Sequence, residues 1–96
     1  MIATAQKEQI RLTQGSFTPS QTADMLTGLI DQKINFYKIM RWSSSVNDEN
    51  VDTSWISDKI NELQAEKEKV KSLVNEARSY GKRVSVKGSF EILLED

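Results

Sequence analysis

Apolar residues recur every three or four positions along two long stretches of this chain, and this spacing predicts two amphipathic helices. The first helix is expected over about residues 18–43 and the second over about residues 52–80. A Thr-Pro-Ser-Gln capping box at residues 18–21 opens the first helix. Gly81 follows the second helix, where glycine commonly ends one. The polar stretch of about residues 43–51 is predicted to be a loop, so the helices should form an antiparallel hairpin.

Alternating apolar and polar residues predict one strand on each side of the hairpin. The C-terminal strand, over about residues 82–94, has the clearer pattern, because only Leu93 interrupts its polar face. The N-terminal pattern starts at Gln9 and is weaker, and residues 1–7 before it are predicted to be disordered. Both strands join the hairpin at its open end through almost no linker, so we expect them to be antiparallel neighbours.

The tripeptide Gly-Ser-Phe occurs in both predicted strands, at residues 15–17 and at residues 88–90. Phe90 lies on the apolar face of its strand, whereas Phe17 is out of phase with the earlier apolar residues of its own strand. A structural repeat should keep the phase. We therefore interpret the tripeptide as a coincidence, or as the sign of a β-bulge at Gly15.

These elements predict a single α+β domain over residues 1–96, with the order β-α-α-β and antiparallel strands. A strand of eleven residues spans about 36 Å, nearly the ~39 Å of a helix of about 26 residues, so the strands can lie along the hairpin or project from it. A two-stranded sheet is marginally stable and has two open edges. Pairing with a second copy gives four strands across a dimer, and we therefore expect a homodimer.

Composition removes several classes of chemistry. The chain has no cysteine and no histidine, so it lacks thiolate chemistry, disulfides and the commonest general base and metal ligand. We expect no enzymatic activity, no cofactor and no metal site. Its 13 basic and 14 acidic residues balance, which leaves no overall field that attracts nucleic acid or an anionic membrane. No apolar run approaches the roughly 18 residues that span a bilayer, so we expect a soluble, cytoplasmic protein without membrane contact.

The predicted loop contains Asp48, Asn50 and Asp52 at alternate positions, as at the start of a calcium-binding loop. Thr53 stands where such a loop needs glycine, and Lys59 stands where it needs a bidentate glutamate. We interpret the segment as a solvated loop whose side chains cap the second helix.

Ile39, Trp42 and Trp55 flank the loop at the closed end of the predicted hairpin. These side chains either close the hairpin or form an exposed tip that binds a partner. Our leading hypothesis for the function is a non-enzymatic protein–protein interaction or scaffold module, which acts through its helix faces or through this tip and has an unknown protein partner.

Lys33 and Lys67 each interrupt an apolar seam and are expected at neighbouring levels of the hairpin. They either form a layer that binds an anion or fixes the helix register, or they extend their ammonium groups into water. We favour the second interpretation, because a buried pair of like charges is strongly unfavourable. The first would make the chain an anion- or small-ligand-binding regulatory domain.

A basic cluster surrounds an aromatic residue near the end of the second helix. It comprises Arg78, Tyr80, Lys82, Arg83 and Lys87. Such a combination can bind single-stranded nucleic acid, which makes a small nucleic-acid-associated protein an alternative function. The same residues also fit a helix C-terminus and an ordinary polar strand face, and the acidic chain end opposes nucleic acid. We therefore disfavour nucleic-acid binding.

Overall fold

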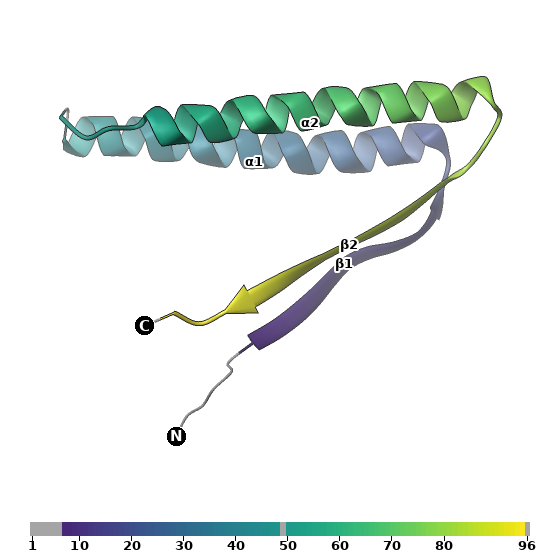
Figure 1. Cartoon of the computed structure of the whole chain (residues 1–96), viewed down its shortest axis with the longest axis horizontal. Coiled ribbons are helices and arrows are strands. Elements are labelled where there is room, and N and C mark those ends of the chain that lie inside the picture. Colours follow the sequence, from purple (N-terminus) through teal and green to yellow (C-terminus); the bar gives the residue numbers. More distant parts are fainter. Residues whose placement is uncertain (1–6, 49, 96) are drawn as a thin grey trace.

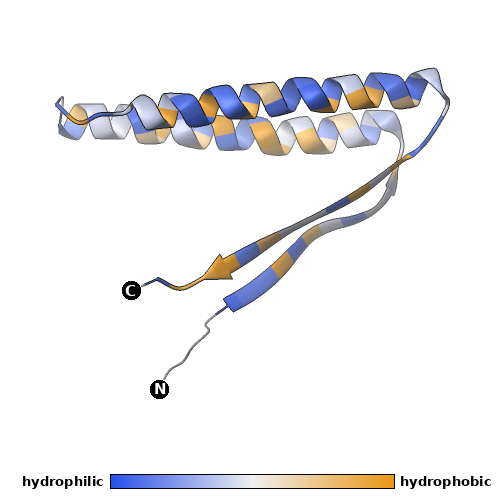
Figure 2. Cartoon of the chain, in the orientation of Figure 1, coloured by the Kyte–Doolittle hydropathy of each residue, from blue (hydrophilic) through white to orange (hydrophobic). Residues whose placement is uncertain are grey.

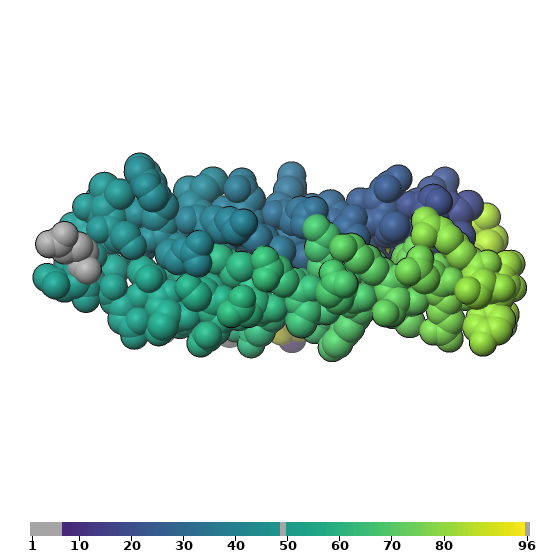
Figure 3. All heavy atoms as spheres, turned by 90° about the horizontal axis from the view of Figure 1, so that it is seen from above, coloured from purple at the N-terminus to yellow at the C-terminus, as the bar shows by residue number. Residues whose placement is uncertain are grey.

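The computed structural model describes residues 7–48 and 50–95 and has the predicted β-α-α-β order. The elements are β1 (Lys7–Phe17), α1 (Pro19–Asn47), α2 (Ser54–Ser79) and β2 (Val84–Leu93). The helices form an antiparallel hairpin, and the strands form a two-stranded antiparallel ribbon joined to its open end (Figure 1). Seen from the side away from the ribbon, α1 and α2 lie side by side along their whole length (Figure 3). No helix in the described ranges is long and apolar enough to cross a bilayer.

The motifs predicted at two helix ends are present. The Thr18 hydroxyl accepts a hydrogen bond from the Gln21 N–H at 3.1 Å, and the Gln21 side chain accepts one from the Thr18 N–H at 3.0 Å. Gly81 has a φ of 63°, a left-handed conformation that favours glycine. Its N–H donates to the Arg78 carbonyl, and the following N–H donates to the Ala77 carbonyl. These two bonds form a Schellman motif, which satisfies carbonyls that the helix leaves free.

α1 is longer than predicted, because it continues to Asn47 through residues expected to be in the loop of about 43–51. Serines in this stretch lower helix propensity only slightly, and the stretch contains no glycine or proline to end the helix. The chain leaves the helix at Asp48, which has an extended backbone and donates its N–H to the Ser44 carbonyl at 3.0 Å.

The ribbon extends further towards the N-terminus than predicted. Lys7, placed by the sequence in a disordered segment, is the first residue of β1 and pairs with Leu93. Its ammonium group also lies 3.5 Å from the Glu91 carboxylate, so a cross-strand ion pair supports this end of β1. The rest of the predicted disordered segment, residues 1–6, lies outside the described residues. β2 itself begins at Val84 and is slightly shorter than the predicted strand.

The ribbon contains a β-bulge, at a different position from the one considered from the sequence. Arg11 pairs with Ser89 and Thr13 with Gly88, so Leu12 is the extra residue. The pairing is regular at Gly15, where a bulge was one of the two alternatives.

The bulge explains the phase of the repeated tripeptide. An extra residue shifts the alternation of a strand by one position. As a result, Phe17 opposite Val84 and Ile10 opposite Phe90 belong to the same face of the ribbon. The tripeptides occupy different places in the ribbon, because residues 15–17 end β1 whereas residues 88–90 lie within β2.

The apolar core is divided between the two ends of the hairpin. Towards the closed end, Ile34, Ile56 and Ile60 form a buried cluster that residues from both helices surround. Towards the open end, Val74 of α2 is 2% exposed. A cavity of about 250 Å³ adjoins it and is lined by residues of α1, α2 and β2. The second part of the core therefore attaches the ribbon to the hairpin.

The ribbon moves away from the hairpin towards its free end (Figure 1). Val84 and Val86 near its base are half-buried, whereas Phe90 and Ile92 on the same face are exposed. The free end of β2 is apolar (Figure 2). Both arrangements considered from the sequence therefore occur in succession, because the ribbon first packs against the hairpin and then projects from it.

Candidate interaction surface

A row of exposed apolar side chains follows one side of α1. We define the α1 outer face by these residues: Leu29, Phe36, Ile39, Trp42 and Val46. Their exposed fractions lie between 45% and 67%. Spacings of seven, three, three and four residues keep them on one broad side of the helix. The described part of the chain therefore leaves uncovered a helix face of the kind that usually packs against protein.

The sequence pointed to Ile39 and Trp42 of this face as parts of a tip, but it did not separate the rest of the face from the apolar side that contacts α2. Leu29, Ile34 and Phe36 all fit one broad apolar stripe at helical spacing. Ile34 is buried against α2, and Phe36 follows it by two residues, which is about 200° around a helix. The two side chains therefore face opposite ways. The two-residue spacing between Ile34 and Phe36 is the sequence signal that could have separated the two apolar rows of α1.

The structure does not bring the two tip tryptophans together. The Trp55 ring packs edge-on against Tyr37, with ring centroids 6.5 Å apart, and so closes part of the hairpin. Trp42 follows Tyr37 by five residues, about 140° around α1, and therefore turns away from Trp55. Trp42 is 67% exposed and lies on the α1 outer face with Ile39, whereas Trp55 is 51% exposed. Trp55 therefore takes part in closing the hairpin, while partner binding by Trp42 stays a prediction from the sequence.

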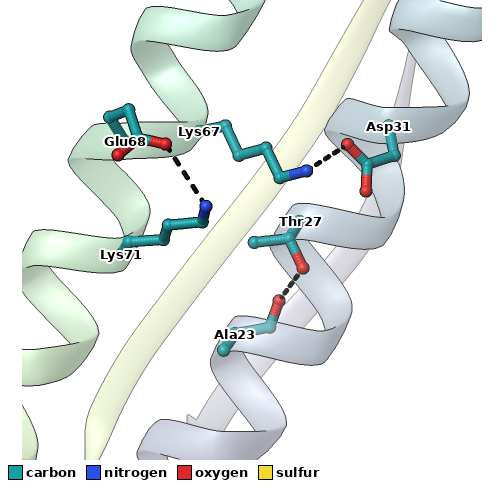
Figure 4. A network of polar contacts seen from close by, with 6 residues as sticks. All are labelled: Ala23, Thr27, Asp31, Lys67, Glu68 and Lys71. Atoms are coloured by element: carbon teal, nitrogen blue, oxygen red, sulfur yellow. Dashed lines mark hydrogen bonds and ion pairs between the residues drawn. The ribbon is translucent and has the colours of Figure 1, made fainter.

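Three polar contacts between described residues join the helices. Arg78 donates to Ser20 and Arg41 donates to Ser57, at 3.3 and 3.1 Å. Lys67 forms an ion pair with Asp31 at 2.7 Å. Figure 4 views this pair from the side of the hairpin away from the ribbon, with the strands behind the helices.

Lys33 and Lys67 have different neighbours. The Lys33 ammonium lies 6.0 Å from the centroid of the Tyr37 ring. It borders a shallow cavity that Glu62 and Glu66 also line, and Lys67 is not among the lining residues. Each lysine therefore has carboxylates or an aromatic face beside it. This arrangement agrees with two separately solvated ammonium groups, while a shared anion layer stays a prediction from the sequence.

We expect the substitution Lys67→Leu to change the free energy of unfolding by less than about 1 kcal/mol, because an exposed ion pair is worth about 0–1 kcal/mol and leucine adds apolar contact along the seam. Urea denaturation at one protein concentration measures the change. Lys67→Ala is the matched control, since it removes the ion pair and the aliphatic stem together and should cost more. A loss above about 2 kcal/mol for Lys67→Leu would show that the ammonium group is required.

The arginines of the basic cluster make contacts within the chain. Arg83 donates to the hydroxyl and the carbonyl of Ser16, at 3.0 and 3.1 Å, and so ties the end of β1 to the start of β2. Arg78 donates to Asn75 in addition to its contact with α1. Tyr80 and Lys82 line one open cavity with Arg83, while Lys87 lies further along β2. The structure gives the two arginines a role in holding the open end together.

The carboxylates of the loop bind backbone N–H groups. Asp48 accepts from the Asn50 N–H at 3.0 Å, and Asp52 accepts from the Ser54 N–H at 2.9 Å. The hydrogen bonds from Ser54 lower the pKa of Asp52, because they stabilise its charged form. Within the described ranges, no three acidic side chains gather into a group that could hold a metal ion.

Comparison of the chain with protein-family models, with curated proteins and with solved structures found no match.

Proposed function

We propose that this chain is a non-enzymatic protein–protein interaction or scaffold module, and that the α1 outer face is its main binding surface. The observation that carries this proposal is that few apolar side chains are buried while many large ones are exposed. Among the residues that the structure describes, only four hydrophobic ones are buried, namely Ile34, Ile56, Ile60 and Val74. More large hydrophobic residues than this are exposed along α1 alone, and exposed apolar surface of such extent commonly marks an interface.

The composition of the α1 outer face supports the same function. It contains Trp42 and Phe36, and aromatic side chains are enriched at protein interfaces because they bury a large area with few rotatable bonds. Phe36 also packs edge-on against Tyr37, at 5.5 Å between ring centroids. Tyr37 packs against the buried cluster, so this contact links an aromatic side chain of the face to the core of the hairpin.

Photo-crosslinking in cells that naturally contain the protein tests this function. A benzophenone amino acid replaces Trp42 in one variant and Glu68 of α2 in the control, since both side chains are exposed. We expect discrete crosslinked species from the Trp42 position and none above background from the Glu68 position. Mass spectrometry of the species identifies the partner. Equal crosslinking at both positions, or none at Trp42, contradicts the proposal.

A further inference from the structure

We infer that the α1 outer face is a homodimer interface, in which α1 packs antiparallel against α1 of a second copy of this chain. The inference rests on the proposed function and names the partner. The relevant side of α1 follows alternating spacings of three and four residues. The positions are Leu29, Gln32, Phe36, Ile39, Ser43 and Val46. This spacing is the heptad pattern of a coiled-coil seam, and a seam of this kind takes another helix as its partner.

The polarity of this seam is the same when read in either direction. Its order is apolar, polar, apolar, apolar, polar, apolar. In an antiparallel pair with the twofold axis midway between residues 37 and 38, Phe36 faces Ile39 of the second copy. Gln32 faces Ser43 of the second copy, and Leu29 faces its Val46. Every polar position then meets a polar position and every apolar position meets an apolar one, which is the self-complementarity that a twofold interface needs.

Neighbouring registers lose this match. A shift of one heptad in one direction places Gln32 opposite Phe36 of the second copy, and a shift in the other direction places Ser43 opposite Ile39. Either shift buries a polar side chain against an apolar one, which is unfavourable when the polar group has no partner. The seam therefore selects a single antiparallel register.

The flanks of the seam are compatible with this register. Lys33, on one flank, comes to lie beside Met40 of the second copy rather than beside its own equivalent. Trp42, on the other flank, lies beside Asn35 of the second copy. No pair of like charges meets across the axis, so the packing carries no electrostatic penalty of that kind.

The area available agrees with a stable dimer. Side chains that are about half exposed contribute on the order of 100 Å² for each aromatic residue and less for each aliphatic one, so the α1 outer face offers roughly 400 Å² per copy. A standard interface buries about 800 Å² per partner, of which a little over half is apolar. The seam thus supplies nearly the whole apolar share of such an interface.

The ribbon continues the same surface at one end of the seam. Leu12 and Thr13 of β1 line a cavity with Met25, Leu29 and Gln32 of α1. Because Leu12 is the bulged residue, it is out of step with the regular alternation of β1. Val46 of the second copy approaches Leu29 in the proposed register, so this apolar hollow lies where the end of the second α1 arrives.

The strand edges are less suited to a second copy. Val84, Ser85, Val86 and Lys87 line the cavity beside the helices, so the base of β2 already lies against the hairpin. The bulge interrupts β1, and bulges commonly protect an edge from pairing. A dimer through α1 avoids both obstacles.

Sedimentation velocity of the purified full chain tests the dimer, with Phe36→Lys as the disrupting variant. Phe36 is 56% exposed in the single chain, so the substitution should leave the circular dichroism spectrum unchanged. We expect twice the chain mass of 10.9 kDa for the wild type, and a dissociation constant raised roughly a hundredfold for the variant. Leu94→Lys, at an exposed residue outside the seam, is the control and should remain dimeric.

Cysteine pairs test the register, since the natural chain has no cysteine. A variant that combines Gln32→Cys with Ser43→Cys should form a covalent dimer under mild oxidation, whereas neither single variant should. The two positions are eleven residues apart on α1, about 16 Å, which is too far for a disulfide within one chain. A parallel dimer would crosslink through either single variant.

A monomeric wild type, a dimer that tolerates Phe36→Lys, or crosslinking of a single variant overturns the inference. The proposed function has a separate readout. A monomeric chain that still crosslinks to a different protein at Trp42 removes the second copy as partner and keeps the interaction function. A monomeric chain without any crosslink removes both.

Discussion

Replacing Ile56 with alanine is expected to lower the free energy of unfolding by about 2–4 kcal/mol. Ile56 is 1% exposed and belongs to the cluster that joins α1 to α2 near the closed end. The substitution removes three carbons from a packed site and leaves a cavity that the neighbouring isoleucines can only partly fill. Because few side chains are buried in the described part of the chain, this loss is a large share of the 5–15 kcal/mol that typical domains possess.

Guanidinium denaturation measures this change, at a fixed protein concentration so that any association affects wild type and variant alike. Ile92→Ala is the matched control, because it makes the same chemical change at a side chain on the projecting part of the ribbon. We expect a cost below about 1 kcal/mol there. Equal costs at the two positions would contradict the division between a buried cluster in the hairpin and an uncovered ribbon end.

Replacing Val74 with alanine is expected to cost about 2 kcal/mol and to loosen the ribbon. Val74 is 2% exposed, and it lines the cavity of about 250 Å³ together with Leu26, Val84 and Val86. The substitution enlarges a space that is already incompletely filled, so the cost comes mainly from lost burial. Hydrogen exchange should become faster in β1 and β2 near the junction, while amides around Ile56 keep their protection.

Val51→Ala is the matched control for Val74→Ala, since Val51 lies in the loop and is exposed. We expect it to change the free energy of unfolding by less than about 0.5 kcal/mol. Hydrogen exchange in the ribbon should stay as in the wild type. A uniform rise in exchange along the whole chain after Val74→Ala would show that the two parts of the core unfold as one unit.

The elements and their order were predictable because each depends on local chemistry. The capping box at residues 18–21 and the glycine at position 81 act within a few residues of the chain, and both form the expected bonds. The alternation over β2 and its short link to α2 were enough to predict an antiparallel strand pair. Such bonds join residues that are close in the chain, so the sequence pattern alone is enough to predict them.

The errors share a different cause. The end of α1 was misplaced because serine is only mildly unfavourable in a helix, so the stop depends on where Asp48 turns the chain. The sequence suggested Gly15 as one possible site for a bulge, but any residue of β1 can be the extra one. Only the pairing with β2 selects Leu12.

The α1 outer face was likewise predictable only in part. Apolar spacing alone showed that α1 carries more hydrophobic side chains than one contact with α2 requires. It did not show which of them remain uncovered, because two overlapping rows at helical spacing look like one broad row. The structure separated them by burying Ile34 against α2 and leaving Phe36 outside.

The sequence by itself therefore determined two helices, two strands, their order and their antiparallel arrangement, because capping bonds and alternation act between near neighbours. Only the tertiary structure decided three further features. These are the bulge at Leu12, the divergence of the ribbon from the hairpin, and the exposure of the α1 outer face. All three depend on contacts between residues far apart in the chain, whose geometry no local pattern contains.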